Sequence, residues 1–368
     1  MPPTFILIQL EFNVPYTLWF EKVGKESMGL VGGKNASLGE LIKADIPVPP
    51  GFAITTEAYD EFLNEGGMRR KIQEVLSRVE LQDIVSLEEA SKTLRELIAT
   101  SPLPKEIEEA IRSNYQALAQ VCDVPDIPVA VRSSATAEDL PGASFAGQQD
   151  TFLWIRGCEK VIEKIKLCMS SLFTSRAISY RMKMGFPHEK VLISVGIQKI
   201  VDAKAAGVMF TLNPLNGDPM KVVIEGNWGL GETVVSGTVN PDKFVVDKVT
   251  REIEKTISLK WVECIYAPEK KGVIHGDTPY DRQNVQCIED EEIVELTRYA
   301  RRIEEYYECP QDIEWAIDKH KPFPLNIFML QSRPETVWSQ KKKEPVLGNK
   351  SVYELLMEKA LSRVKIGS

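Results

Sequence analysis

Apolar residues recur at two different periods along the chain, and the change of period separates helical from extended regions. From about residue 57 to 120, Leu and Ile recur every three or four residues among charged residues, which predicts consecutive amphipathic helices. From 127 to 155 the pattern becomes extended, because two β-branched runs, 127–132 and 150–154, flank a polar loop that contains glycine. A further helix is predicted over 158–183.

Short β-branched runs dominate the second half of the chain. They predict strands at 191–200, 207–211, 221–225 and 243–247. An amphipathic helix is expected over 291–307, and a hairpin of two strands, 312–318 and 325–333, follows it. Helices and strands therefore mix without internal repeats, and the pattern predicts an α+β fold.

Both ends of this pattern carry helix signals. A glycine-rich turn precedes a helical run over 35–43. A capping-box pattern at Ser351 and Glu354 predicts a terminal helix over 351–366, after a polar linker. The apolar stripe of this helix is expected to pack on its own domain or to dock a partner.

Composition and charge narrow the class of protein. The 368 residues are 43% hydrophobic and 27% charged, which is enough for two or three packed lobes. A formal net charge of −8 gives no general attraction to nucleic acid or to anionic membranes, so neither is expected as a partner. The six cysteines form no CxxC pair, and we expect thiols of a reducing compartment rather than a zinc site. Without a recognisable signal peptide or membrane-spanning run, the sequence predicts a cytoplasmic protein.

The predicted hairpin carries the clearest candidate chemistry. Alternation places Asp312, Glu314 and Asp318 on one face of the first strand. Gln331 and Arg333 share a face of the return strand, so pairing would bring carboxylates, an amide and a guanidinium together. Carboxylates suit Mg²⁺, and an arginine fork suits phosphate oxygens. The alternative is a solvated hairpin face with a surface ion pair.

Three glycine-bearing segments could contact phosphates. The strand that ends at Arg132 leads into a loop of small and hydroxylated residues around Ser144, which is either a phosphate-covering loop or an exposed linker. The turn before Lys34 presents a lysine at a helix start but lacks Walker spacing. The segment 225–237, which contains Glu232, follows a strand but does not match GxGxxG, and a buried tight turn is its alternative.

In this order, these segments resemble the nucleotide-binding domain shared by phosphoenolpyruvate synthase, pyruvate phosphate dikinase, rifampin phosphotransferase and phenylphosphate synthase. The matching stretches are GGKNASLGEL, IPVPPGFAIT, VAVRSSATAEDLPGASFAGQQDT, SLFTSRA, VGIQKIVDAKAAGVMFT, EGNWGLGETVVSGTVNPDKF, QDIEWAID and LQSRPET. They cover about residues 28–337. Each motif alone is weak, but the ordered set is specific to the family.

The resemblance implies an ATP-grasp fold, in which lobes clasp ATP between β-sheets. The implied division is an extension (1–27), the N-terminal lobes (28–211), a C-terminal lobe (212–337), a linker (338–350) and a helix (351–368).

The resemblance also implies a role for each candidate residue. Lys34, Arg132 and Arg333 are the expected catalytic contacts to the ATP phosphates, with Ser144 in the loop that closes over them. The metal side is expected to be built from Asp312, Glu314 and Gln331, the last also lining the phosphate end. The backbone of Gln198, Lys199 and Ile200 would meet adenine, and Glu232 would hold the ribose or the closed loop. ATP and Mg²⁺ are the implied cofactors.

Family members carry a separate phosphohistidine domain, and none of His188, His275 and His320 lies in a comparable context. The expected function is therefore that of an ATP-binding subunit of a dikinase-type phosphotransferase. It would pass a (pyro)phosphoryl group from Mg-ATP to a histidine on a partner chain, which also binds the acceptor, and release AMP. Phenol is the favoured acceptor, as in phenylphosphate synthase, and pyruvate is the alternative. A non-catalytic ATP-sensing module and an isolated fragment without activity remain open.

Overall fold

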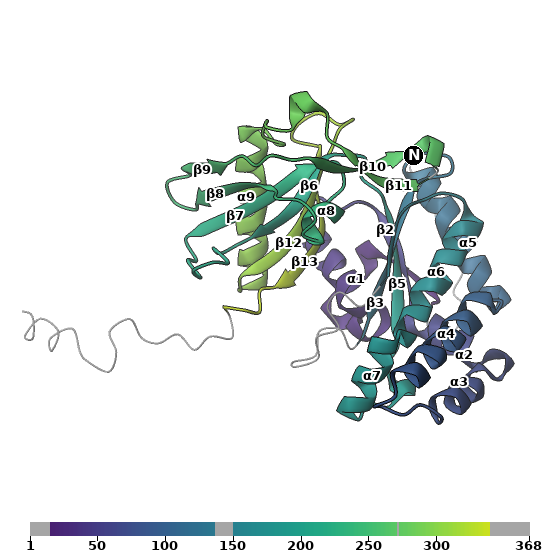
Figure 1. Cartoon of the computed structure of the whole chain (residues 1–368). Helices are drawn as coiled ribbons and strands as arrows, with labels where there is room; N and C mark the ends of the chain where they lie inside the picture. Colours follow the sequence, from purple (N-terminus) through teal and green to yellow (C-terminus); the bar gives the residue numbers. More distant parts are fainter. Residues whose placement is uncertain (1–14, 137–149, 271, 339–368) are drawn as a thin grey trace, which may run out of the picture.

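Two lobes, each built on an antiparallel sheet, make up the computed structural model, which describes residues 15–136, 150–270 and 272–338 (Figure 1). This arrangement confirms the predicted α+β ATP-grasp class. Ser144, the linker beyond Trp338 and the predicted terminal helix over 351–366 lie outside the described residues.

The first lobe has a five-stranded sheet in the order β1-β2-β5-β3-β4. Its strands are β1 (Thr17–Trp19), β2 (Gly51–Ile54), β3 (Val129–Ala135), β4 (Thr151–Ile155) and β5 (Ile193–Lys199). Six helices pack around one face (Figure 1): α2 (Thr56–Asn64), α3 (Met68–Leu76), α4 (Ile84–Thr100), α5 (Lys105–Val121), α6 (Cys158–Ser170) and α7 (Ser175–Met184). Val129 and Val131 enter this helical core, so alternation turns Ala130 and Arg132 to the opposite face.

The single helix expected over 158–183 is wrong, because the chain breaks between α6 and α7. Thr174 has extended backbone angles, and its side chain accepts a hydrogen bond from the Ala177 amide. A threonine in this position caps the start of a new helix.

The second lobe has a six-stranded sheet in the order β13-β12-β6-β7-β8-β9. Its strands are β6 (Ala203–Phe210), β7 (Lys221–Trp228), β8 (Asp242–Asp247), β9 (Ile253–Thr256), β12 (Gln311–Asp318) and β13 (Ile327–Pro334). Helix α9 (Asp290–Tyr307) covers one face, and its Leu296 and Ile303 share a core with the fully buried Trp315.

A short helix and a hairpin extend the second lobe toward the first (Figure 1). They are α8 (Glu232–Val235), β10 (Val262–Ala267) and β11 (Gly272–Asp277). The sequence pattern did not predict β9, β10 or β11, because their alternation of apolar and polar residues is irregular.

Helix α1 (Met28–Lys43) joins the two lobes. It is interrupted at Gly32, whose φ of 70° lies in the left-handed region, so the predicted helical run over 35–43 is only its second part. Ala36 and Leu38 pack with Phe20 near the first sheet, whereas Leu41 belongs to the core of the second lobe.

The change of sheet falls between Lys199 and Ala203, earlier than the lobe boundary expected after residue 211. Strand β6 already pairs with β12 and β7 in the second sheet. The expected extension over 1–27 also contributes β1 to the first sheet. Within the described part of the chain, no helix is long and apolar enough to cross a membrane.

Candidate functional site

The hairpin β12–β13 has the pairing that its polar residues predict. Asp312 lies opposite Arg333, and Glu314 lies opposite Gln331. The Asp312 Oδ2 atom accepts a hydrogen bond from Nε of Arg333 at 2.8 Å and forms an ion pair with its Nη2 at 2.7 Å. The Asp312 carboxylate is therefore already paired with the Arg333 guanidinium, whereas Glu314 lies two residues further along β12.

A register shift between Glu314 and Trp315 sets which side chains face the other lobe. Trp315 and Met329 beyond the shift lie in the core of the second lobe. The shift places two residues, Leu330 and Gln331, where one would normally fit, and such a bulge re-aims the side chains beside it. The bulge thereby sets Gln331 opposite Glu314, whose own orientation follows from alternation, because its neighbours Ile313 and Trp315 both lie in the core.

Arg132 crosses the gap between the lobes. Its Nη1 donates to the Leu330 carbonyl at 3.2 Å, and its Nη2 is 3.7 Å from Oε2 of Glu314. Both charged side chains are about one-fifth to one-quarter exposed, so solvent and ligands can reach them. Arg132 on β3 and Glu314 on β12 thus bring together residues from opposite lobes.

Lys34 lies at the same end of β3. Its Nζ is 3.4 Å from the carbonyl oxygen of Ser133. The kink of α1 makes this approach possible, because a Cβ on Gly32 would come within 2.3 Å of the Ser134 Oγ and 2.4 Å of its carbonyl oxygen. Asn35 fastens the helix to β5 by donating to the Ser194 hydroxyl at 3.0 Å.

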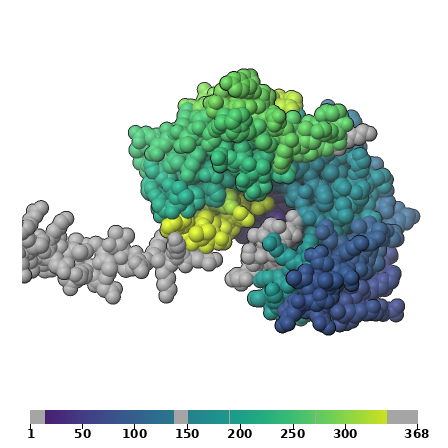
Figure 2. All heavy atoms as spheres, viewed as in Figure 1, coloured from purple at the N-terminus to yellow at the C-terminus, as the bar shows by residue number. Residues whose placement is uncertain are grey.

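The predicted phosphate and metal residues therefore gather where the two lobes face each other, and we call this group of residues the charged cleft. Its members within the described residues are Lys34, Arg132, Asp312, Glu314, Gln331 and Arg333. Figure 2 shows the second lobe lying over the first, with the end of β13 in yellow along its lower edge. Burial raises the pKa of Asp312, and the neighbouring Arg333 guanidinium only partly opposes this.

The segment predicted to meet adenine lies where the chain passes from the first sheet to the second. Gln198 is buried and donates through its side-chain amide to the Pro49 carbonyl at 3.2 Å. The backbone amides of Lys199 and Ile200 donate to the carbonyls of Pro50 and Pro128. Any contact with a base must therefore use other atoms of this segment.

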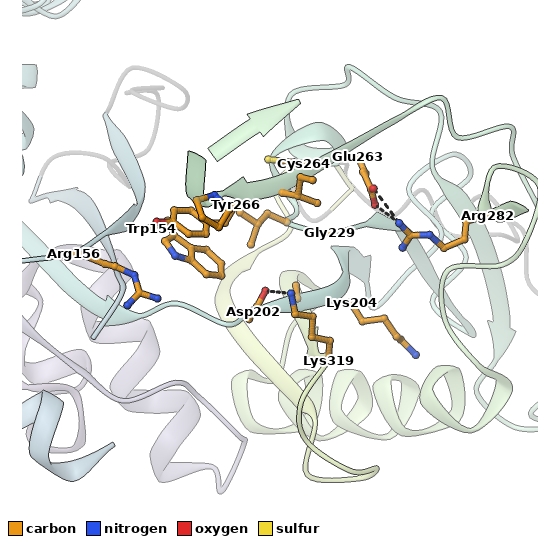
Figure 3. A pocket seen from close by; sticks show the side chains of 14 residues that line it. Trp154, Arg156, Asp202, Lys204, Gly229, Glu263, Cys264, Tyr266, Arg282 and Lys319 are labelled. Atoms are coloured by element: carbon orange, nitrogen blue, oxygen red, sulfur yellow. Dashed lines mark hydrogen bonds and ion pairs between the residues drawn. The ribbon is translucent and has the colours of Figure 1, made fainter. Parts of the chain in front are cut away.

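A cavity of about 590 Å³ opens beside this crossing point (Figure 3). Its lining comes from both lobes: Trp154, Arg156, Asp202, Ala203, Lys204, Gly229, Leu230, Glu263, Cys264, Ile265, Tyr266, Pro268, Arg282 and Lys319. We call it the hinge cavity. Trp154 and Tyr266 stack at one side, with ring centroids 4.5 Å apart and planes inclined by 10°.

Three of the four basic side chains that line the hinge cavity are paired with carboxylates, and the fourth, Arg156, donates to the backbone carbonyl of Asp126. Lys204 pairs with Glu292 at 2.8 Å, and Lys319 pairs with Asp202 at 2.8 Å. Arg282 likewise lies 3.0 Å from Glu263. The cavity therefore combines a stacked aromatic wall with basic side chains, most of which are paired with carboxylates.

The hinge cavity and the charged cleft lie along one surface. Ala130, which packs in a cluster with Trp154 and Leu230, precedes Arg132 by two positions on the same face of β3. Of the segments singled out in the sequence, 225–237 contributes Gly229 and Leu230 to the lining, whereas none of the individual candidate residues that the structure describes lines the cavity. Trp154 and Tyr266 were missed because an isolated aromatic residue in a strand carries no signal of a ligand, and β10 itself was not predicted.

Glu232 lies apart from the charged cleft, at the start of α8. Its Oε1 is 3.6 Å from Nε2 of His275, and its Oε2 is 3.8 Å from Sγ of Cys264. The ribose role expected for it remains a prediction.

The sequence model described as "Pyruvate phosphate dikinase, AMP/ATP-binding domain" matches residues 28–352. A probable phosphoenolpyruvate synthase from Staphylothermus marinus is 44% identical over 95% of this chain and 46% of its own length. The phosphoenolpyruvate synthase of Helicobacter pylori is 45% identical over 89% of this chain and 43% of its own length. A probable phosphoenolpyruvate synthase from Methanocaldococcus jannaschii is 44% identical over 90% of this chain and 28% of its own length.

The chain spans less than half the length of these curated relatives. Among solved structures, D-alanyl-alanine synthetase A from Vibrio cholerae matches 70% of this chain and 66% of its own at 9% identity. Its TM-score of 0.20 is too low to bear on the fold.

Proposed function

Because the chain belongs to the family of the pyruvate phosphate dikinase AMP/ATP-binding domain, we propose that it binds Mg-ATP between its lobes and starts a phosphoryl transfer. The observation that carries this proposal is the meeting of Arg132 and Glu314, from opposite lobes, at 3.7 Å. Lys34 lies beside Arg132, and Arg333 lies on the strand next to Glu314. This set offers cations for phosphate oxygens and carboxylates for a metal ion.

Mg²⁺ fits the oxygen donors of the hairpin. Glu314, Gln331 and Asp312 present carboxylate and amide oxygens from adjacent strands. When bound, the ion would neutralise charge on the ATP phosphates. Arg333 would exchange its bond to Asp312 for phosphate oxygens, and Lys34 and Arg132 would hold the same group from the first lobe.

The hinge cavity suits the base of the nucleotide. Its stacked aromatic wall offers an apolar surface for a planar ring. Phosphates are better placed in the cleft, where Lys34 and Arg132 lie beside Glu314, a carboxylate that could bind the metal ion. With the base in the hinge cavity and the phosphates in the cleft, ATP would lie along one face of β3, with adenine near Ala130 and the phosphates near Arg132.

The proposed transfer moves a pyrophosphoryl group from ATP to a histidine nitrogen. A bond forms between that nitrogen and the β-phosphorus, the bond from the β-phosphorus to the bridging oxygen breaks, and AMP leaves with that oxygen. None of the three histidines is at the cleft: His188 contacts Arg181, His275 lies on β11, and His320 contacts Asp202. The receiving histidine is therefore proposed to belong to a partner.

For the final acceptor we propose pyruvate, ahead of the phenol favoured by the sequence. The support is the naming of the relatives as phosphoenolpyruvate synthase or probable phosphoenolpyruvate synthase. The acceptor site itself is proposed to lie with the partner.

Nucleotide product analysis tests the proposal. The chain is given Mg-ATP with and without a separately produced phosphohistidine domain from a related phosphoenolpyruvate synthase. AMP is expected only with that domain. Glu314→Gln should lower the rate by about 100-fold or more, because it removes a preorganised charge at the reacting group. Glu254→Gln, on the exposed strand β9 of the same sheet, is the matched control and should leave the rate unchanged.

Two other outcomes of this experiment would contradict the proposal. ADP in place of AMP would contradict pyrophosphoryl transfer. ATP that binds but is never converted, with any partner supplied, would favour the ATP-sensing module.

A further inference from the structure

Outside the charged cleft, we propose that Glu232, Cys264 and His275 bind one transition-metal ion of the Zn²⁺ class. Oxygen, sulfur and nitrogen atoms of these side chains all lie within 4.8 Å of one another. The cysteine spacing in the sequence predicted no such site, because the three residues come from separate elements. We call this group the Glu-Cys-His cluster.

The distances in the cluster are close to those of a coordination shell. Around Zn²⁺, bonds of about 2.0–2.3 Å at tetrahedral angles place neighbouring ligand atoms roughly 3.4–3.6 Å apart. Oε1 of Glu232 is 3.6 Å from Nε2 of His275, and Sγ of Cys264 is 3.8 Å from Oε2 of Glu232. Only small side-chain shifts are needed to bring the three ligands onto one ion.

The backbone holds the three ligands in place. Cys264 on β10 lies directly opposite His275 on β11, and opposite residues of antiparallel strands point to the same side. The loop before Glu232 is tied to the same strand, because the Leu230 amide donates to the Cys264 carbonyl at 2.7 Å. The cluster is therefore preformed rather than assembled from mobile loops.

The donor set selects the class of ion. A thiolate and an imidazole suit Zn²⁺ or Co²⁺, whereas Mg²⁺ and Ca²⁺ prefer oxygen ligands alone. The Cys264 S–H bond breaks as the sulfur–metal bond forms, and its proton passes to water. Glu232 and His275 are both more than 40% exposed, so an ion can enter from solvent, and three protein ligands leave a fourth position for water.

Binding at the cluster would fasten the β10–β11 hairpin to α8. Cys264 also lines the hinge cavity, so the ion would stiffen one wall of that cavity. This consequence does not depend on the proposed phosphotransferase activity.

Cobalt absorption tests the proposal. The metal-free full chain is titrated with Co²⁺, and the thiolate-to-cobalt charge-transfer band is followed. One equivalent of Co²⁺ should develop the band, and Zn²⁺ should remove it by competition. Cys264→Ser should abolish the band, and His275→Gln and Glu232→Gln should each weaken Co²⁺ binding by at least about 10-fold.

Two matched variants control for other thiols and imidazoles. Cys122→Ser removes a partly buried thiol of the first lobe, and His320→Gln removes an exposed histidine; both should keep the band and the affinity. Circular dichroism shows whether Cys264→Ser folds. If that variant does not fold, the Co²⁺ affinity of His275→Gln becomes the test of the proposal. The proposal is overturned by absence of the band in the unmodified chain, by its persistence in folded Cys264→Ser, or by unchanged affinity in His275→Gln.

Discussion

Asp312 combines a buried carboxylate with a charged neighbour, and burial has the larger effect on its pKa. Because its pKa is raised in the folded protein, the charged form costs stability, so this residue's contribution is greatest at low pH and is lost as pH rises through the folded pKa. Asp312→Asn removes that dependence. The free energy of unfolding of the variant, relative to the unmodified chain, should therefore fall as pH is lowered from neutral through this pKa.

Denaturant unfolding at several pH values measures this effect. Asp290→Asn is the comparison, because Lys255 lowers the pKa of the Asp290 carboxyl and the dependence should have the opposite slope. Equal slopes for the two variants would show that burial does not dominate at Asp312.

At this scale, the sequence predicted that polar groups of the hairpin lie together, whereas it did not predict the aromatic wall of the hinge cavity. Alternation predicted that these side chains share the faces of two paired strands, and the structure adds the register, which sets Asp312 opposite Arg333 and Glu314 opposite Gln331. The stacking of Trp154 on Tyr266 depends on a contact between lobes, and no local pattern encodes such a contact.

Among the elements, α1 depends most on a single residue. Gly32→Ala would force an alanine into a φ of 70° and its Cβ to within 2.4 Å of the Ser134 backbone. We expect the free energy of unfolding to fall by about 1–3 kcal/mol, and we expect nucleotide binding to weaken because Lys34 is displaced.

Gly29→Ala is the matched control for this substitution. Gly29 lies in the same helix, and a Cβ there meets nothing within 4 Å. The free energy of unfolding of Gly29→Ala should be unchanged or should rise by about 0.5–1 kcal/mol. Equal losses at the two glycines would contradict the importance of the kink.

Asp242 on strand β8 forms a buried ion pair with Lys260, which no pattern in the sequence predicted. Nζ of Lys260 lies 2.7 Å from Oδ1 of Asp242, and both side chains are fully buried. Backbone amides of Ser258 and Cys287 also donate to Asp242. Lys260→Met should cost roughly 3–5 kcal/mol, because it leaves a buried carboxylate without its cation.

Chemical denaturation measures this loss against Lys221→Met. Lys221 forms a partly exposed pair with Asp247, and its removal should cost about 1 kcal/mol or less. Adding Asp242→Asn to Lys260→Met should recover part of the loss, whereas no recovery would argue against an electrostatic cause.

The elements that the sequence predicted are those with strong periodicity. Helix α9 and the hairpin β12–β13 were placed to within a few residues, because each has a continuous apolar stripe or a clear alternation. The hairpin β10–β11 escaped prediction, because apolar and polar residues do not alternate regularly along either strand.

For the whole molecule, the hinge cavity predicts where affinity for nucleotide resides. Tyr266→Ala removes half of the stacked aromatic wall and should weaken binding of ATP, and of adenosine alone, by about 1–2 kcal/mol, or roughly 5- to 30-fold in Kd. Isothermal titration measures both ligands. Tyr280→Ala is the control, because Tyr280 is 89% exposed. Loss of affinity for ATP but not for adenosine would place the base elsewhere.

Helix α1 also has a consequence for dividing the polypeptide. The chain enters the second lobe twice, once through Leu41, Ala44 and Ile46 and again at Ala203. The backbone amide of Met329 on β13 donates to the carbonyl of Pro47 at 2.8 Å, which ties the first visit to the sheet edge. A fragment that starts at Ala203 would therefore expose an apolar groove and tend to aggregate. Supplying residues 28–47 as a separate peptide would fill that groove, so the two pieces should reassociate as complementing halves.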